Sequence, residues 1–388
     1  MTIMANDNEL QELQTVPKDK DSKNQEQKDL KSKLQESVNQ EAEHQVSEFQ
    51  VSPKQKETLE KQQYRFAGSH SAVKVCGWTK SMLRNLGGCY KFLFYGIRSH
   101  QCLQMTTSMF CASRCKFCWR GEKAPVSKEW YGPVDEPKVI IDGSIEAHKQ
   151  LLVGFQGSDK TKPEVFKQSE NVKHVALSLT GEPITYPKIN EILEEFHKQK
   201  ISTFLVTNAQ YPEQLLQIKN VTQFYISLDA PNKKMLKEID VPLFPDYYGR
   251  LLKSLDIMRE KKFRSCIRLT IIKGLNDVDL EGYKELIERG QPDFIEVKGY
   301  MHVGASQQIL LREHMPQHDE IKEFSEKLIA IMPEYEIISH HAPSRVYCLI
   351  HKNLKRKQFL NFAKFFEIVN AGGEAKALDY SSEKMCPN

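Results

Sequence analysis

Short apolar runs alternate with amphipathic segments over most of the chain beyond residue 101. Six of these runs have the length and the β-branched and aromatic content of buried strands: CLQMTTSMF, HVALSL, STFLVT, QFYISL, CIRLTII and FIEVKGY. Between them lie segments whose apolar residues recur at helical spacing, such as INEILEEFHKQK and YYGRLLKSLDIMREKK. This alternation predicts an α/β protein with a parallel sheet covered by helices.

Six strand-helix units suit an incomplete (β/α)6 barrel, similar to an open TIM barrel, better than a flat sheet. Active sites of such folds lie at the carboxyl ends of the strands. Polar motifs follow the first four runs, in the order CASRCKFC, TGEP, TNAQ and DAP. Each alone is compatible with an ordinary turn, but together with a cysteine motif they predict a site at this edge of the sheet.

Residues 1–62 consist mainly of Gln, Glu, Lys, Asp and Ser, with very few aromatics. Such a segment cannot bury enough surface to offset chain entropy, so we expect a disordered polar tail. Residues 63–104 are rich in aromatic, basic and cysteine residues and form an expected N-terminal segment that binds metal. The barrel domain is expected over 105–352, and a basic helix and tail over 353–388.

The net charge of +4 over 388 residues permits nucleic-acid binding without requiring it. No apolar run is long enough to span a bilayer, and the first residues lack the features of a signal peptide. We therefore expect a cytoplasmic protein that does not enter a membrane. Because thiols stay reduced there, the nine cysteines are interpreted as metal ligands, catalytic groups or core residues before disulfides.

Three cysteines, Cys111, Cys115 and Cys118, form a C-x3-C-x2-C motif, here called the first triad. Structural zinc sites are closed by four ligands, and no second pair of cysteines accompanies this motif. Three thiolates on one loop instead suit a [4Fe-4S] cluster whose fourth iron is open to another ligand. The spacing therefore favours an iron-sulfur cluster over zinc.

Cys76, Cys89 and Cys102, here called the second triad, lie thirteen residues apart upstream. Core packing is the ordinary fate of isolated cysteines. The glycines beside two of them supply the loose backbone that a cluster loop requires, so we expect a second [4Fe-4S] cluster with its own open iron.

The first triad, after a strand at the start of an α/β pattern, resembles the radical S-adenosylmethionine superfamily. With both triads, the chain resembles the tRNA 4-demethylwyosine synthases of the wyosine pathway, in the short form without a flavodoxin domain. Several stretches carry this resemblance: CGWTKSMLRNLGGCYKFLFYGIRSHQCLQMTTSMFCASRCKFCWR, SLTGEPITYP, VTNAQYPEQL, YISLDAP, VKGYMHVGAS, MPQHDEIKEF and PSRVYCL.

The resemblance implies a carbon-carbon lyase that joins two carbons of pyruvate to N1-methylguanosine-37 of tRNA(Phe), forming 4-demethylwyosine. It implies S-adenosyl-L-methionine as the radical source and two [4Fe-4S] clusters. Lys91, two residues past the middle cysteine of the second triad, is implied as the Schiff-base partner of pyruvate; otherwise it is a surface lysine. An external ferredoxin or flavodoxin is expected to supply electrons.

The resemblance also implies residues that contact S-adenosyl-L-methionine. Many superfamily members have Gly where this chain has Thr180. Each of these residues could equally be an ordinary turn or packing residue. The expected set is Phe117, Thr180, Gly181, Glu182, Asn208 and Ser227, with Asp229 as a weaker candidate.

An RNA substrate requires a basic surface and aromatic rings on which an exposed base can stack. We assign the basic residues only as a patch: Lys80, Arg84, Arg98, Arg120 and the run HKNLKRK, with Trp78, Tyr90 and Trp119 for stacking. Two alternatives remain open at this point, namely another radical enzyme with two clusters and a noncatalytic RNA-binding protein stabilised by zinc.

Overall fold

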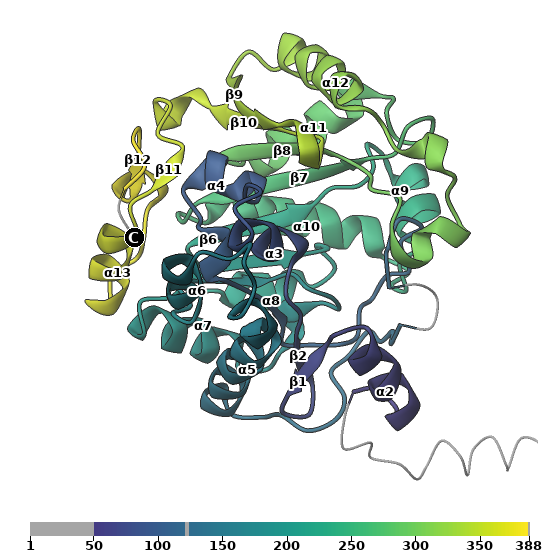
Figure 1. Cartoon of the computed structure of the whole chain (residues 1–388). Coiled ribbons are helices and arrows are strands. Elements are labelled where there is room, and N and C mark those ends of the chain that lie inside the picture. Colours follow the sequence, from purple (N-terminus) through teal and green to yellow (C-terminus); the bar gives the residue numbers. More distant parts are fainter. Residues whose placement is uncertain (1–49, 121–123, 387–388) are drawn as a thin grey trace, which may run out of the picture. The chain divides into compact units, whose positions relative to one another are not determined.

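The structure, a computed structural model, describes residues 50–120 and 124–386 (Figure 1). Within these residues the main sheet has ten strands, in the order β1-β2-β3-β4-β5-β6-β7-β8-β10-β9. Strands β3 to β8 are parallel and follow one another in sequence order. These six are Cys102–Thr106, His174–Leu177, Ser202–Thr207, Gln223–Ser227, Ser265–Ile271 and Phe294–Gly299. The six apolar runs are thus confirmed as parallel strands.

Antiparallel strands extend both edges of this parallel core. They are β1 (Arg65–Ala67) and β2 (Ser71–Val73) beside β3, and β9 (Tyr335–His341) and β10 (Val346–His351) beside β8. The sequence pattern did not indicate these four strands, so the sheet is mixed. A separate pair, β11 (Phe359–Leu360) and β12 (Ser381–Ser382), lies near the C-terminus.

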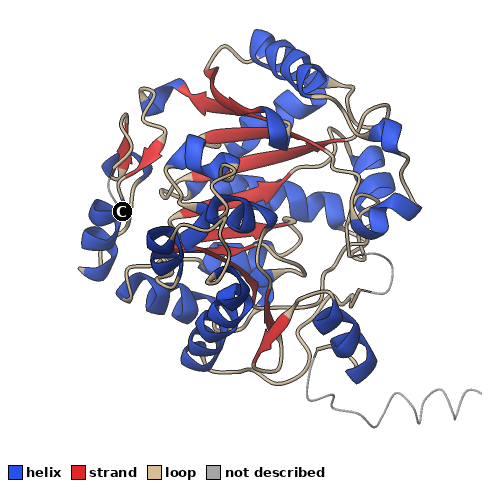
Figure 2. Ribbon diagram, viewed as in Figure 1, coloured by secondary structure: helices blue, strands red, loops and turns tan. Residues whose placement is uncertain are grey.

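Helices surround the sheet, as Figure 2 shows in blue. The expected helices are confirmed as α7 (Ile189–Lys198) and α10 (Tyr247–Glu260). The other α-helices among the described residues are α2 (Pro53–Lys61), α3 (Gly77–Leu83), α4 (Tyr90–Tyr95), α5 (Pro137–Leu152), α6 (Pro163–Ser169), α8 (Pro212–Gln217), α9 (Lys233–Asp240), α11 (Leu280–Gly290), α12 (His318–Ile331) and α13 (Phe362–Asn370). In the described part of the chain, no helix combines the length and the apolar character needed to cross a bilayer.

The two faces of the sheet have different cores because side chains alternate along each strand. Phe224 and Ile226 of β6 join the larger core, which also contains residues of α5, α7, α10, α11 and α12. Tyr225, between them, joins a second core with Phe94 and Tyr95 of α4. The face toward α4 is therefore the face on which the N-terminal segment packs, and Figure 1 shows α4 next to β6, β7 and β8.

The expected polar tail over 1–62 lies mostly outside the described residues, but its last part is ordered. Ser52 caps α2, and Gln55 completes a capping box with it. Val51 and Tyr64 on either side of α2 are buried together with Met109. Apolar residues flanking the helix therefore anchor it, although the helix itself is polar.

The C-terminal segment differs from the expected basic helix and tail. The basic run forms a 3-10 turn, η7 (Lys352–Leu354), and the following helix α13 is mostly apolar. Phe365 of α13 and Tyr380 beyond it are buried in the core that faces α4. This segment therefore completes the core instead of forming a separate tail.

Candidate active site and metal centres

The loop that carries the first triad follows β3 and lies against the C-terminal end of α9. The backbone N–H of Arg114 donates to the carbonyl oxygen of Asp240 at 3.0 Å. A tight turn follows, in which the N–H of Cys118 donates to the carbonyl oxygen of Cys115 at 2.9 Å. Strand end and helix end together fix the path of the loop.

The thiols of the first triad interact electrostatically. Burial raises the pKa of Cys111 to about 11, and it raises the pKa of Cys115 well above its ordinary value. The negative charges of Asp240 and of the other two thiols add to the shift at Cys115. Three thiolates here need nearby positive charge, which a bound iron-sulfur cluster supplies. The loop fits such a group.

Among residues 50–120 and 124–386, no group of three His, Cys, Asp or Glu side chains has the arrangement needed to hold a metal ion. In a four-iron cluster each thiolate binds a different iron, so its ligands do not converge on a single point. The finding therefore argues against a site for a single ion such as zinc among the described residues. It does not exclude a cluster, so the two triads remain candidates for cluster binding.

The residues after β4 and β5 meet the first triad. Glu182 Oε2 accepts a hydrogen bond from the backbone N–H of Asn208 at 3.1 Å. The side-chain Nδ2 of Asn208 donates to Cys111 Sγ at 3.4 Å and to Ser113 Oγ at 3.5 Å. The structure thus brings together two of the expected S-adenosyl-L-methionine contacts and one expected iron ligand.

Glu182 has one carboxylate oxygen that is free to bind a donor. Its side chain is buried, and Oε1 has no hydrogen-bond partner among the described residues. Burial raises the pKa of this carboxyl to about 7, although hydrogen bonds from Thr207 and Asn208 act in the opposite direction. An ammonium group such as that of a bound amino acid would satisfy Oε1.

Gly181 is required by the close approach of two loops. Its φ of +63° lies in the left-handed region, and a Cβ built on it would lie 1.9 Å from the carbonyl oxygen of Ser108. The backbone N–H of Glu182 then donates to the carbonyl oxygen of Phe110 at 2.7 Å. The strand-end loops after β3 and β4 are thereby held together.

The other expected contacts are spread around this centre. Phe117 is partly buried against the larger core, and Thr180 lines a cavity beside the first triad. Ser227 lies at the end of β6, where its Oγ accepts a hydrogen bond from Arg268 Nη2 at 3.2 Å. Asp229 is buried, and burial raises its pKa to about 6.

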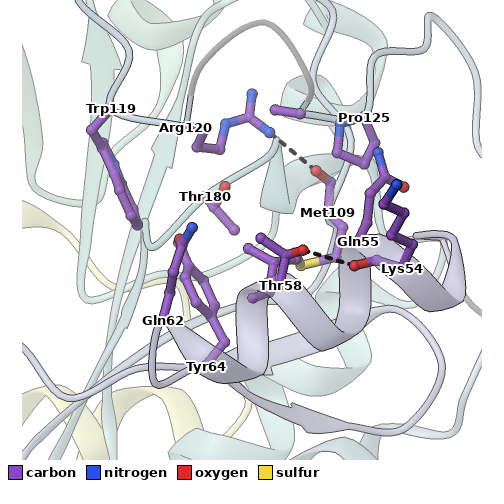
Figure 3. Close-up of a pocket in the computed structure, with 12 residues that line it drawn as sticks. Lys54, Gln55, Thr58, Gln62, Tyr64, Met109, Trp119, Arg120, Pro125 and Thr180 are labelled. Carbon is purple, nitrogen blue, oxygen red and sulfur yellow. Dashed lines mark hydrogen bonds between the residues drawn. The ribbon is translucent and has the colours of Figure 1, made fainter. Parts of the chain in front are cut away.

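A cavity of about 270 Å³ is lined in part by Trp119 and Arg120, the two residues that follow the first triad in sequence (Figure 3). One wall is α2, which contributes Lys54 and Thr58, together with Gln62 directly after the helix. The opposite side includes Thr180 and Arg120. The cavity therefore reaches one of the motifs expected to contact S-adenosyl-L-methionine.

Arg120 was expected only as part of an RNA-binding patch, but it lies at the first triad. The charges of Cys111 and Cys118 raise its pKa against the effect of burial, and its Nη1 donates to the carbonyl oxygen of Met109 at 3.1 Å. Its guanidinium thus supplies fixed positive charge to the thiols. One indication of this contact was present in the sequence, namely that Arg120 follows Trp119 directly and so lies close to the first triad in the chain.

The second triad lies where three elements begin. Cys76 and Cys89 are the N-cap residues of α3 and α4, and Cys102 is the first residue of β3. The backbone N–H of Cys89 donates to Ser99 Oγ at 2.8 Å. Burial raises the pKa of Cys89 and of Cys102 to about 12, and the charge of Cys76 adds to both shifts. The structure therefore brings these three cysteines together, although they are far apart in sequence.

Lys91 lies within α4, two residues past Cys89. Its Nζ is 4.4 Å from the ring centroid of Tyr225 and 5.2 Å from that of Phe204. Its charge lowers the pKa of both Cys89 and Cys102, against the larger effect of burial. It therefore faces the sheet beside the second triad instead of extending into solvent.

A buried carboxylate that was not expected from the sequence binds the hydroxyl of Tyr225, the residue over whose ring Lys91 lies. Glu296 of β8 is fully buried and accepts hydrogen bonds from Tyr90 at 3.0 Å, Tyr95 at 2.9 Å and Tyr225 at 3.2 Å. Three neutral donors thus satisfy this carboxylate. Glu296 fastens α4, and with it Cys89, to the sheet.

Two cations beside Glu296 were also missed. Arg268 of β7 is the register partner of Glu296, and Lys298 follows Glu296 by two residues on the same face of β8. Burial lowers the pKa of Lys298 to about 8, and the charge of Arg268 adds to this shift. The sequence did contain a signal for these charges. Glu296 and Lys298 stand at alternate positions of FIEVKG, whereas a strand buried on both faces is normally apolar.

The aromatic candidates for stacking on RNA differ in exposure. Tyr90 is buried, so it offers no surface to a base. Trp78 packs edge-on against His341 with 5.1 Å between ring centroids, and Trp119 stacks on Tyr64 at 6.0 Å. Both tryptophans are half-buried and remain candidates.

Two family models match the chain in succession. The model of the radical SAM superfamily matches residues 105–287, and a model described as wyosine base formation matches residues 289–351. The first of these contains the first triad, Glu182 and Asn208.

Curated relatives match most of the chain. The S-adenosyl-L-methionine-dependent tRNA 4-demethylwyosine synthase of Xenopus laevis is 45% identical over 336 residues, which cover 84% of this chain and 46% of the relative. The human enzyme is 46% identical over 301 residues, which cover 77% of this chain and 41% of the relative. The chain thus spans about half the length of the curated relatives it matches.

Two solved structures are similar over nearly their whole length. A structure of TYW1 with a lysine-pyruvate adduct bound has 37% identity and a TM-score of 0.71, over 81% of this chain and 99% of that one. The crystal structure of archaeal TYW1 has 34% identity and a TM-score of 0.64, over 78% and 97%.

Proposed function

The chain belongs to the family of S-adenosyl-L-methionine-dependent tRNA 4-demethylwyosine synthases, and we propose that it catalyses the reaction for which this family is named. Its fold is the radical SAM α/β fold with a mixed sheet. In the proposed reaction, pyruvate supplies two carbons to N1-methylguanosine-37 of tRNA(Phe), which closes the third ring of 4-demethylwyosine. One carbon of pyruvate is lost, so the enzyme would be a carbon-carbon lyase.

One observation carries this proposal: a single strand, β3, leads from the second triad to the first. Cys102 begins β3, and the loop with Cys111 follows its end. If the first triad is the radical source and the second triad lies at the pyruvate site, β3 connects the two sites directly. We propose that β3 to β8 form an incomplete barrel whose interior, facing α4, holds both sites.

The first triad would hold a [4Fe-4S] cluster whose free iron binds S-adenosyl-L-methionine. The chemistry that such a cluster would supply, when bound and reduced, is the electron for cleavage of the sulfonium to a 5′-deoxyadenosyl radical. Glu182 has a free buried oxygen suited to the amino group of the methionine part, and Asn208 lies between Glu182 and Cys111. Phe117, Thr180, Gly181 and Ser227 would complete the binding site.

The second triad would hold the second [4Fe-4S] cluster, close to the site of pyruvate. Support comes from the mutual electrostatic influence of Cys76, Cys89 and Cys102 and from the half-buried position of all three. The positive charge of a cluster would offset the burial that disfavours the thiolates of Cys89 and Cys102.

Lys91 would form a Schiff base with the ketone of pyruvate, releasing water. The solved structure of TYW1 with a lysine-pyruvate adduct bound supports this role. Here Lys91 interacts with Cys89 and Cys102 and lies over Tyr225, which holds its Nζ near the second triad. Its side chain is therefore suitably placed for this role.

The partners follow from the reaction. The tRNA would present its anticodon loop to the open edge of the site, and an external ferredoxin or flavodoxin would supply electrons. We expect the reaction to take place in the cytoplasm, where thiols stay reduced.

Mass spectrometry of tRNA nucleosides tests the proposal. The chain is reconstituted with iron and sulfide without oxygen, then given S-adenosyl-L-methionine, a strong reductant, labelled pyruvate and tRNA(Phe) carrying N1-methylguanosine-37. A labelled tricyclic base is expected, and tRNA that lacks the N1-methyl group serves as the control. Radical cleavage without this base would favour another radical enzyme with two clusters, and zinc without iron would favour a noncatalytic RNA-binding protein.

A further inference from the structure

Beside the second triad, basic side chains in the interior of the protein outnumber the carboxylates near them. Four basic side chains interact electrostatically in this region: Lys91, Arg268, Lys298 and Arg345. Two carboxylates accompany them, Glu296 and Asp229. Among the described residues, none of the ion pairs includes any of the four cations.

Of these two buried carboxylates, Glu296 is already satisfied by hydrogen bonds. Glu296 accepts three hydrogen bonds from tyrosine hydroxyls, through both of its oxygens. Glu296 therefore acts on the cations through its charge, without a direct ion pair to any of them among the described residues. A further anion would find unused donors here, and hydrogen bonds between charged partners are stronger than neutral ones.

Arg268 and Lys298 keep donors free. The only side-chain hydrogen bond that Arg268 makes among the described residues is from Nη2 to Ser227 Oγ, at 3.2 Å. Lys298 Nζ donates to the carbonyl oxygens of Gly299 at 3.4 Å and Ser344 at 3.5 Å, which are long hydrogen bonds. Both side chains are half-buried, so they line an accessible part of the interior.

The strand register sets Arg268 and Lys298 close together. Glu296 pairs with Arg268, and Thr270 pairs with Lys298 one row further along the strands. The charges of Arg268 and Cys89 both act on Lys298. Lys91 also acts on Cys89, so the two lysines approach the same thiol from α4 and from β8.

We propose that Arg268 and Lys298 bind the carboxylate of the 2-oxo acid whose ketone reacts with Lys91. This inference rests on the proposed function, and it assigns the part of the site that recognises the acid. A guanidinium and an ammonium together bind a carboxylate through several charge-assisted hydrogen bonds. The neighbouring carbonyl carbon then lies within reach of Lys91.

Trapping of the Schiff base tests the proposal directly. The reconstituted chain without tRNA is incubated with pyruvate or with its neutral methyl ester, and cyanoborohydride reduces any imine to a stable amine. Mass spectrometry then measures the modified fraction of Lys91 against ligand concentration. The ester keeps the reactive ketone but lacks the anion.

For Lys298→Met, we expect the concentration of pyruvate needed for half-maximal trapping to rise by about ten- to a hundredfold. Trapping of methyl pyruvate should change by less than about twofold, and Lys298→Arg should recover most of the preference for the acid. Arg268→Gln should show the same selective loss. Lys253→Met on the outer face of α10 serves as the matched control and should leave both ligands unaffected.

Failure of the carboxylate site and failure of the Schiff base would give different results. An equal loss for pyruvate and its ester, or no loss for either, would overturn the proposed carboxylate site while leaving the role of Lys91 intact. If the unaltered chain traps neither ligand on Lys91, the Schiff base itself is wrong, and this inference is overturned together with it.

Discussion

Tyr90 and Glu296 are 206 residues apart in the chain, yet the Tyr90 hydroxyl donates to Glu296 Oε2 at 3.0 Å. Tyr90 directly follows Cys89, so this hydrogen bond connects the second triad to β8. A buried hydrogen bond to a carboxylate contributes more to stability than a neutral one. The position of Cys89 therefore depends on a residue near the other end of the sheet.

Replacing Tyr90 by Phe tests this connection. The change removes one of three donors from a buried carboxylate, so we expect the free energy of unfolding to fall by about 1.5–3 kcal/mol. Urea denaturation of the reconstituted protein measures it. Tyr248→Phe, on the outer side of the larger core, should cost less than about 0.5 kcal/mol. An equal effect of both changes would show that the hydroxyl of Tyr90 has no special role.

The two triads should fail differently when their cysteines are replaced by Ala. Changes at Cys111, Cys115 or Cys118 should abolish cleavage of S-adenosyl-L-methionine, because the cluster that cleaves it is lost. Changes at the second triad should leave some unproductive cleavage while removing the tricyclic product. Chromatography of 5′-deoxyadenosine and of tRNA nucleosides measures both. Equal loss of both products from all six variants would contradict the proposed division between the triads.

Lys91→Arg separates charge from chemistry. Arginine keeps a cation over Tyr225 but forms no Schiff base with a ketone, so the tRNA product should fall by about a hundredfold or more. The content of iron and the yield of 5′-deoxyadenosine should stay near those of the unaltered chain. Near-normal product formation would remove Lys91 from the mechanism.

Gly181→Ala should damage the first site through the backbone. The new Cβ would meet the carbonyl oxygen of Ser108 and sit at a positive φ, so we expect a loss of at least about 2 kcal/mol in the free energy of unfolding and weaker binding of S-adenosyl-L-methionine. Gly154→Ala is the matched control, since nothing lies within 4 Å of its added Cβ. Thermal unfolding and equilibrium binding measure the two effects. A stable Gly181→Ala protein with normal binding would show that the two loops can separate without consequence.

Asp293 should make stability depend on pH. Burial raises its pKa from 3.8 to about 6, although hydrogen bonds from Ser265 oppose the shift. The folded state therefore favours the protonated carboxyl, and stability falls as the pH rises through the folded-state pKa. Relative to Asp293→Asn, the unaltered chain should lose about 1–1.5 kcal/mol between pH 5 and pH 8. Urea denaturation across this range measures the difference, and parallel pH profiles of the two proteins would contradict the assignment.

The parallel strands could be predicted because each is a compact apolar run with a polar motif at its carboxyl end. Strand β10 was missed although VYCLIH is mostly apolar and buried along almost its whole length. Strand β9 was missed because YEIISHH carries two histidines and a glutamate and is half exposed along its length. Whether such an edge segment becomes a strand depends on its partner, in this case Cys348 and its neighbours.

Part of the candidate site could be found from spacing alone. The first triad and the motif with Glu182 lie within short segments, so local pattern identifies them. The cluster of Tyr90, Glu296 and Arg268 assembles from three distant segments. Strand register pairs Arg268 with Glu296, and the packing of α4 on the sheet brings Tyr90 to them. Sequence reasoning placed Tyr90 on the surface because an aromatic residue among basic ones suggested contact with RNA.

Strand β3 has a further consequence, since it begins at Cys102 and ends shortly before Cys111. Its five residues span about 13 Å of extended backbone in the middle of a sheet. A strand hydrogen-bonded on both sides resists stretching and bending, so it keeps Cys102 at a fixed separation from the start of the loop that carries the first triad. We therefore expect this separation to stay unchanged when ligands bind at either triad.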